Sequence, residues 1–135
     1  MVINMGKING VHHIALRPTS ELYEKTVKFY TEILGCTFVR GWGEGDSAAC
    51  MLSCGDNTCM EILHGKTDGT PKDSNFEHVA FWVDEVDNFI EEIRAAGYQV
   101  TIEPKSLNLT PDYPVRIAFF IGPCGETIEL FKELK

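Results

Sequence analysis

The chain has 135 residues, of which 44% are hydrophobic and 24% charged, and its net charge is −8. These values predict one globular domain that can bury a core, and they exclude a disordered chain. The apolar runs are too short to span a bilayer, and the twelve Lys and Arg residues are scattered rather than gathered into the basic stripe that binds nucleic acid. We therefore expect a small-molecule partner, with no nucleic acid and no membrane.

The N-terminus and the cysteines indicate the compartment. Residues 1–7 lack the charged start and long apolar stretch of a secretory leader, which predicts a cytoplasmic protein. The five cysteines are odd in number and show no paired spacing, so we expect reduced thiols that pack as small hydrophobes. Cys54 and Cys59 are separated by four residues, wider than a zinc knuckle, which disfavours a cysteine metal site.

The first half of the chain predicts a βαβββ module over about residues 8–64. Residues 11–17 read as a strand, and Thr19 or Ser20 caps a helix that ends at Gly35. Three short strands are expected at residues 36–40, 47–53 and 58–64, joined by turn-rich segments.

A linker over residues 65–75, with glycine, proline and polar residues, precedes a second module over about 76–135. Its expected strands are 76–83, 99–103, 115–121 and 127–131, and its helix is 85–95. The stretch Pro104–Pro114 contains three prolines and is expected to be a long irregular connection, either a binding loop or a plain surface loop.

The two halves repeat one pattern. His13-Ile-Ala-Leu, a helix and Leu34-Gly35 are echoed by His78-Val-Ala-Phe, a helix and Ala96-Gly97. Each half closes on a strand with a carboxylate: Glu61 lies 48 residues after His13, and Glu129 lies 51 residues after His78. Such self-similarity predicts an α+β fold made of two tandem βαβββ modules.

Strand alternation places the four polar residues on one side of the sheet. Successive side chains of a strand point to opposite faces, so His13 lies on the same face as Ala15, and His78 on the same face as Ala80. In each strand the residue between the two is apolar and lies on the opposite face. The two amphipathic helices would cover the apolar face. We therefore expect His13, Glu61, His78 and Glu129 to face a common cleft.

Two imidazoles and two carboxylates suit a divalent ion such as zinc, nickel, iron or manganese, and they leave positions open for substrate. A single His or Glu on a strand is more often a solvated or hydrogen-bonded residue, but four at matching repeat positions favour a metal site. His12 competes with His13 for the first position. The repeat pairs His13 with His78, so His12 and the strand-end His64 are expected to be structural.

The sequence resembles the vicinal oxygen chelate superfamily, and within it the glyoxalase I-like proteins. The phrases that match are His13-Ile-Ala-Leu-Arg17, Phe29-Tyr30-x-x-x-Leu34-Gly35, Glu77-His78-Val-Ala-Phe and Gly122-Pro123-x-Gly125-x-x-Ile128-Glu129-Leu130. The resemblance implies two modules curled into a curved-sheet cleft, the glyoxalase/bleomycin resistance/dioxygenase fold. It also implies one divalent metal, nickel or zinc first and cobalt, manganese or iron otherwise, and a homodimer whose sites can lie between subunits.

The resemblance further implies the chemistry. The second carboxylate, Glu61, favours glyoxalase I, a lactoylglutathione lyase, which isomerises a hemithioacetal of methylglyoxal and a thiol to a 2-hydroxy thioester through an enediolate. Glu129 and Glu61 would exchange the proton, and which one acts on which face is open. Arg17 matches a position that binds the glutathione carboxylate, with a rim salt bridge as its alternative, and Trp82 would line the pocket or pack in the core.

One position, Gly65, leaves the substrate open, and two alternative functions are kept. Gly65 stands where glutathione-using relatives commonly have Asn, so another thiol or another vicinal dioxygen substrate is an alternative to glutathione. A methylmalonyl-CoA epimerase-like enzyme is the first alternative, although such enzymes usually have Gln at the position of Glu61. A non-catalytic small-molecule or antibiotic-binding protein of the same fold is the second.

Overall fold

The computed structural model describes residues 8–65, 76–122 and 126–135, and the chain divides into two compact units. The first unit is His13–His78, and the second is Met1–His12 together with Val79–Lys135, so the division falls inside two strands. Most of the expected 65–75 linker lies outside the described residues, as do residues 1–7, Cys124 and the matched Pro123 and Gly125. The expected organisation as one domain therefore stays a prediction.

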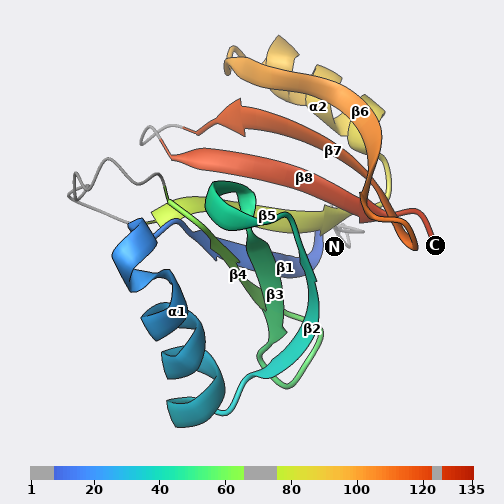
Figure 1. Cartoon of the computed structure of the whole chain (residues 1–135). Helices are drawn as coiled ribbons and strands as arrows, with labels where there is room; N and C mark the ends of the chain where they lie inside the picture. Colours follow the sequence, from blue (N-terminus) through green and yellow to red (C-terminus); the bar gives the residue numbers. More distant parts are fainter. Residues whose placement is uncertain (1–7, 66–75, 123–125) are drawn as a thin grey trace, which may run out of the picture. The chain divides into compact units, whose positions relative to one another are not determined.

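The first unit is built on a four-stranded sheet and one helical segment (Figure 1). Its elements are β1 (Ile8–Leu16), α1 (Ser20–Lys28), the π-helix η1 (Phe29–Ile33), β2 (Thr37–Trp42), the short 3₁₀-helix η2 (Gly45–Ser47), β3 (Ala49–Ser53) and β4 (Cys59–Leu63). The strand order is β2-β3-β4-β1, with β1 parallel to β4 and the other neighbours antiparallel.

The second unit repeats that arrangement. Its elements are β5 (Phe76–Val83), α2 (Val86–Ala95), β6 (Val100–Thr110), β7 (Tyr113–Ile121) and β8 (Thr127–Glu133). The strand order is β6-β7-β8-β5, with β5 parallel to β8. Even the register recurs, because Ala15 pairs with Glu61 in the first unit and Ala80 pairs with Glu129 in the second. The predicted α+β fold of two βαβββ modules is confirmed.

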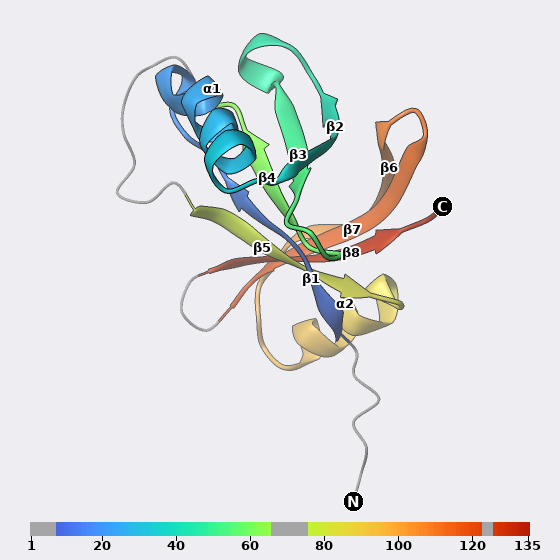
Figure 2. The same ribbon diagram turned by 90° about the horizontal axis from the view of Figure 1, so that it is seen from below.

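Both units pack a helix on the apolar face of their sheet, as the alternation predicted (Figures 1 and 2). In the second unit Val86, Ile90 and Ile93 of α2 pack with Val83, Ala118 and Leu130. In the first unit the buried cluster is Cys50, Leu52 and Ile62, against which Tyr23, Val27 and Tyr30 of the helical segment pack.

The first helical segment ends at Gly35, as the sequence predicts, but its last turn is a π-helix rather than an α-helix. Thr31 donates its hydroxyl to the carbonyl of Val27 at 2.8 Å, and the backbone N–H of Leu34 bonds the carbonyl of Phe29 at 3.1 Å, which makes the last turn a π-helix. Gly35 then takes a φ of +78°, and its counterpart Gly97 takes +98°, the left-handed conformation that ends a helix.

The prediction of an irregular connection over Pro104–Pro114 was wrong. These residues form a hairpin, in which β6 runs to Thr110 and β7 begins at Tyr113. Pro104 is tolerated because β6 is the edge strand of its unit and its register shifts between Ile102 and Lys105. A proline lacks the N–H that a central strand needs, but an edge or a bulge does not require it.

Candidate metal centre

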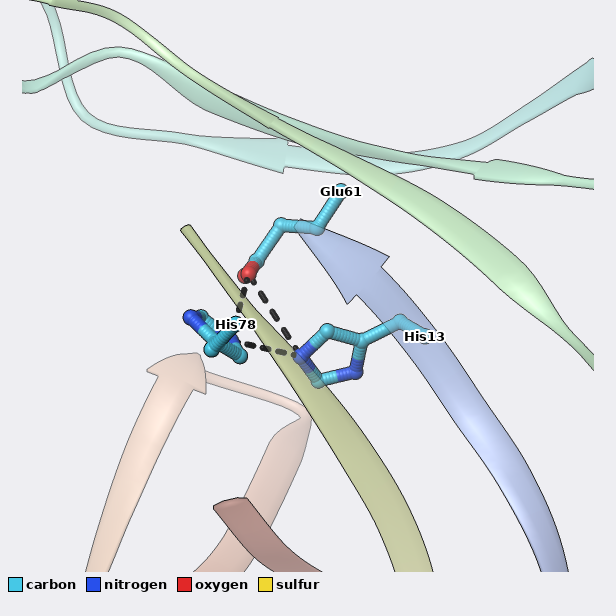
Figure 3. A group of neighbouring side chains, drawn as sticks. All are labelled: His13, Glu61 and His78. Carbon is cyan, nitrogen blue, oxygen red and sulfur yellow. Dashed lines mark hydrogen bonds and ion pairs between the residues drawn. The ribbon is translucent and has the colours of Figure 1, made fainter. Parts of the chain in front are cut away.

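Three of the four predicted ligands converge in the first unit. His13 Nε2 lies 3.2 Å from His78 Nε2, and Glu61 Oε1 lies 3.4 Å from each of these two nitrogens (Figure 3). All three residues are buried, with His13 exposed by only 1%. Two imidazole nitrogens and one carboxylate oxygen therefore face one point.

Three different strands supply these side chains. His13 comes from β1, Glu61 from β4 and His78 from β5 (Figure 3). Glu61 pairs with Ala15 on one side and with Met51 on the other, which fixes its place in the middle of the sheet of the first unit. The neighbouring Ile62 points the opposite way, into the apolar cluster under α1.

The donor set fits a divalent cation. A tetrahedral ion at about 2.0–2.1 Å from each donor places the donors roughly 3.3–3.4 Å apart, close to the separations between these three atoms. Nitrogen and carboxylate donors together suit borderline metals. His13, Glu61 and His78 thus form a candidate metal-binding triad.

Glu129, the fourth predicted ligand, belongs to the second unit. It lies in β8, is buried with 4% exposure, and pairs with Ala80 on one side and Phe119 on the other. Its position within its own module is the same as that of Glu61 in the first. Its role as a ligand or base stays a prediction.

Arg17 forms the rim ion pair that the sequence left as an alternative. Its Nε donates to Glu77 Oε2 at 3.2 Å, and its Nη1 donates to the carbonyl of His64 at 3.3 Å. The side chain is 38% exposed, so solvent reaches the guanidinium. Glu77 was not predicted as its partner, because 60 residues separate the two and no local pattern joins them.

Trp82 and His12 pack together in the second unit. The two rings meet edge-on with centroids 5.1 Å apart, and the centroid of the Phe131 ring lies 4.1 Å from that of His12. His12 is buried, and its Nε2 lies 3.1 Å from the hydroxyl of Tyr113, which donates to Glu133. His12 is therefore held in the interior, as expected of a structural histidine, whereas its partners Tyr113 and Glu133 were not predicted.

A close approach of two backbone segments after β4 explains why residue 65 is a glycine. A Cβ on Gly65 would lie 2.1 Å from the carbonyl oxygen of Pro18, so this backbone admits no side chain there. The adjacent His64 packs its ring 4.9 Å from Tyr23, and its Nδ1 lies 2.7 Å from the carbonyl of Gly65. His64 thus has the structural place that the sequence predicts.

In the described part of the chain, no helix is long and apolar enough to cross a membrane.

The sequence is similar to those of known proteins. A family model described as the Glyoxalase/Bleomycin resistance protein/Dioxygenase superfamily matches residues 10–130. The chain is similar to a glutathione transferase FosA of Serratia marcescens, with 28% identity over 126 residues that cover 91% of this chain and 80% of that protein.

Solved structures share the fold at low identity. A methylmalonyl-CoA epimerase from Mycobacterium tuberculosis matches with a TM-score of 0.75 and 18% identity over 99% of this chain and 94% of that one. A Mn(II)-bound glyoxalase from Novosphingobium aromaticivorans matches with a TM-score of 0.72 and 22% identity over all of this chain, which spans 42% of that one.

Proposed function

Because the chain belongs to the glyoxalase/bleomycin resistance protein/dioxygenase superfamily, we propose that it is a metal-dependent glyoxalase I-like lyase. It would isomerise the hemithioacetal of methylglyoxal and a thiol to a 2-hydroxy thioester. The observation that supports this most is Glu61, a carboxylate that lies 3.4 Å from both histidines of the candidate triad.

The metal would be held by His13, Glu61 and His78, with Glu129 as the fourth ligand. Glu129 is included because its module repeats the register of the first, with Ala80 paired to it as Ala15 is paired to Glu61. Nickel or zinc is proposed first, with cobalt, manganese or iron as alternatives. A bound divalent ion supplies Lewis-acid stabilisation of the negative charge that develops on adjacent substrate oxygens.

The proton would be moved by the two glutamates. In the proposed mechanism Glu129 removes the proton from the carbon that bears the thiol, and Glu129 or Glu61 delivers it to the neighbouring carbon. Both carboxylates are at least nine-tenths buried, which keeps bulk water from the transferred proton. The thiol itself keeps its bond to carbon throughout.

The contacts to the thiol cosubstrate would differ from those that glutathione-using enzymes commonly make to glutathione. Gly65 has no room for the amide side chain found there in relatives, because Pro18 occupies that space. Arg17 remains a candidate for a substrate carboxylate, which would compete with Glu77 for the exposed guanidinium. Trp82 is a candidate for the pocket wall.

Two other activities of the superfamily are the alternatives. The similarity to a glutathione transferase favours addition of a thiol to a metal-bound substrate, and the fold of a methylmalonyl-CoA epimerase favours proton exchange at the carbon between two carbonyl groups. The epimerase shares with glyoxalase the removal of a carbon-bound proton. The transferase reaction does not remove a carbon-bound proton.

Metal analysis followed by three assays tests the proposal. The purified protein would be stripped with a chelator, reloaded with Ni²⁺, Zn²⁺, Co²⁺ or Mn²⁺, and given methylglyoxal with glutathione and with other small thiols. We expect thioester formation that chelator abolishes and metal restores. No metal-dependent thioester with any thiol would refute the lyase, and metal-dependent epimerisation or thiol transfer in parallel assays would identify an alternative.

We also propose a homodimer as the assembly. The helical segment and β2 expose several large apolar side chains, some of which a second copy would cover: Leu22, Phe29, Ile33, Leu34, Phe38 and Val39. Sedimentation or size-exclusion mass measurement would decide, and a monomer at micromolar concentration would contradict the proposal.

A further inference from the structure

Two cysteines meet where the β2–β3 hairpin opens, although 18 residues separate them along the chain. Thr37 and Ser53 form the terminal pair of this antiparallel ladder. Cys36 precedes Thr37 and Cys54 follows Ser53, so the two cysteines stand one step beyond that pair, opposite each other. In addition to the effect of burial, Cys54 is close enough to raise the pKa of the Cys36 thiol.

The register of the ladder, continued by one step, gives a backbone spacing that suits a disulfide. Directly opposed residues of an antiparallel pair have Cα atoms about 4.5–5.5 Å apart, and disulfides accept separations of roughly 4.4–6.8 Å. Both backbones are also fixed: the N–H of Cys36 bonds the carbonyl of Tyr30 at 2.8 Å, and that of Cys54 bonds the carbonyl of Thr58 at 3.0 Å. The backbone of each cysteine is thus held in place on its own side of the pair.

Exposure separates this pair from the buried cysteine of the same module. Cys54 is exposed and Cys36 is half-buried, so a dissolved oxidant can reach them. Cys50 is buried, and burial raises the pKa of its thiol, which disfavours the reactive thiolate.

We propose that Cys36 and Cys54 form a reversible disulfide, with a small-molecule disulfide such as oxidised glutathione as the oxidant. One thiolate attacks a sulfur of oxidised glutathione, forming a mixed disulfide and releasing one glutathione thiolate. The second cysteine loses its proton and attacks the mixed disulfide, releasing the second glutathione. The protein loses two protons and two electrons, and one oxidised glutathione becomes two reduced molecules.

The pair would respond to pH in a defined direction. Burial, and then the neighbouring Cys54, raise the pKa of Cys36 above the ordinary value of 9.0. Because only the thiolate attacks, closure of the disulfide should accelerate up to about tenfold per pH unit between pH 7 and 9.

Peptide mapping tests the proposal directly. Tryptic cleavage leaves Cys36 alone on residues 29–40, places Cys50, Cys54 and Cys59 on residues 41–66, and places Cys124 on residues 117–132. After equilibration with excess oxidised glutathione and trapping of free thiols, we expect residues 29–40 linked to 41–66, with the link removed by dithiothreitol.

Single variants identify the partner. The link should vanish in Cys54→Ser, whose Cys36 should instead retain one glutathione, and it should persist in Cys59→Ser as the matched control. Persistence of the link in Cys54→Ser would overturn the proposal. So would separate glutathione adducts on Cys36 and Cys54 in the unaltered protein.

Discussion

The two modules share one topology but bury their helices to different depths. Helix α2 of the second unit buries Val86, Ile90 and Ile93, whereas no residue of α1 or η1 is fully buried. The three converging donor atoms, by contrast, all lie in the first unit. The second unit therefore buries more of its helix, while the first unit has the candidate triad and exposes more large apolar side chains on its helical segment.

A repeated fold therefore does not divide stability and chemistry equally between its two halves. Buried apolar area stabilises a module in proportion to what it removes from water, and α2 removes more than α1. A partly exposed helix stabilises less, but it is free to pack on another molecule. Variants in matched positions of the two modules can measure each contribution separately.

The largest effect is expected from the carboxylate of the second module. Glu129→Gln removes the proposed base but keeps the shape of the side chain, so we expect turnover of the hemithioacetal to fall by about 10³-fold. His13, Glu61 and His78 remain to hold the metal, so we expect much of the metal affinity to be kept, although Glu129 is the proposed fourth ligand, and the melting temperature to change little. Steady-state kinetics and metal analysis of the same preparation measure both, and unchanged activity would refute the role of Glu129.

Glu61→Gln is the matched change in the first module. It alters a member of the triad itself, so we expect metal affinity to weaken together with activity. If both variants lost metal equally and activity equally, the expected difference between Glu61 and Glu129 in metal affinity would be wrong.

The next effect is on stability. Ile90→Ala empties a fully buried site under α2, and we expect a loss of roughly 2–5 kcal/mol in the free energy of unfolding. Leu22→Ala in α1 removes a side chain that is 42% exposed, and we expect less than about 1 kcal/mol. Urea unfolding of both variants gives the two values. Equal losses would contradict the difference between the helices.

A smaller stability effect is expected at the buried hydroxyl of the second unit. Tyr113→Phe leaves His12 and Glu133 without the hydroxyl that lies between them, which we expect to cost about 1–2 kcal/mol. Tyr98→Phe, at an exposed tyrosine, is the control and should be nearly neutral. Denaturant midpoints distinguish the two, and a neutral Tyr113→Phe would mean that the hydroxyl is not part of the packing of this unit.

Local periodicity was enough to predict most of this fold. Strand alternation placed His13 and Glu61 opposite the apolar residues, and the repeat selected His13 over His12, because both inferences depend on neighbours within one strand or one module. The hairpin over residues 100–121 was missed because its prolines suggest a loop unless the strand is known to lie at an edge.

Contacts between distant segments could not be predicted in the same way. Arg17 and Glu77 are 60 residues apart, and His12 and Tyr113 are 101 apart. The opposition of Cys36 and Cys54 likewise depends on the register of β2 and β3, which includes a shift between Phe38 and Arg40. Register is set by the pairing of whole strands rather than by the residues that happen to meet.

The smallest effect concerns the N-terminal turn of α2, which has an ion pair that α1 lacks among the described residues. Arg116 donates two hydrogen bonds to Asp87, at 2.6 and 2.7 Å, and these bonds lower the pKa of the Asp87 carboxyl below its ordinary value of 3.8. A carboxylate whose pKa is lower in the folded chain than in the unfolded one stabilises the fold above the unfolded pKa. That contribution is lost as the pH falls through the folded pKa.

Asp87→Asn should therefore lower the melting temperature slightly at pH 7, and the difference from the unaltered protein should shrink as the pH falls from about 4 toward 3. Because Asp87 is exposed and Arg116 is partly exposed, the difference should also shrink in high salt. Asn at this position also removes the attraction of a carboxylate to the helix N-terminus, so Arg116→Gln and the double variant are needed to isolate the pair. A difference in melting temperature that stays constant between pH 7 and 3 would show that Asp87 acts through its shape rather than its charge.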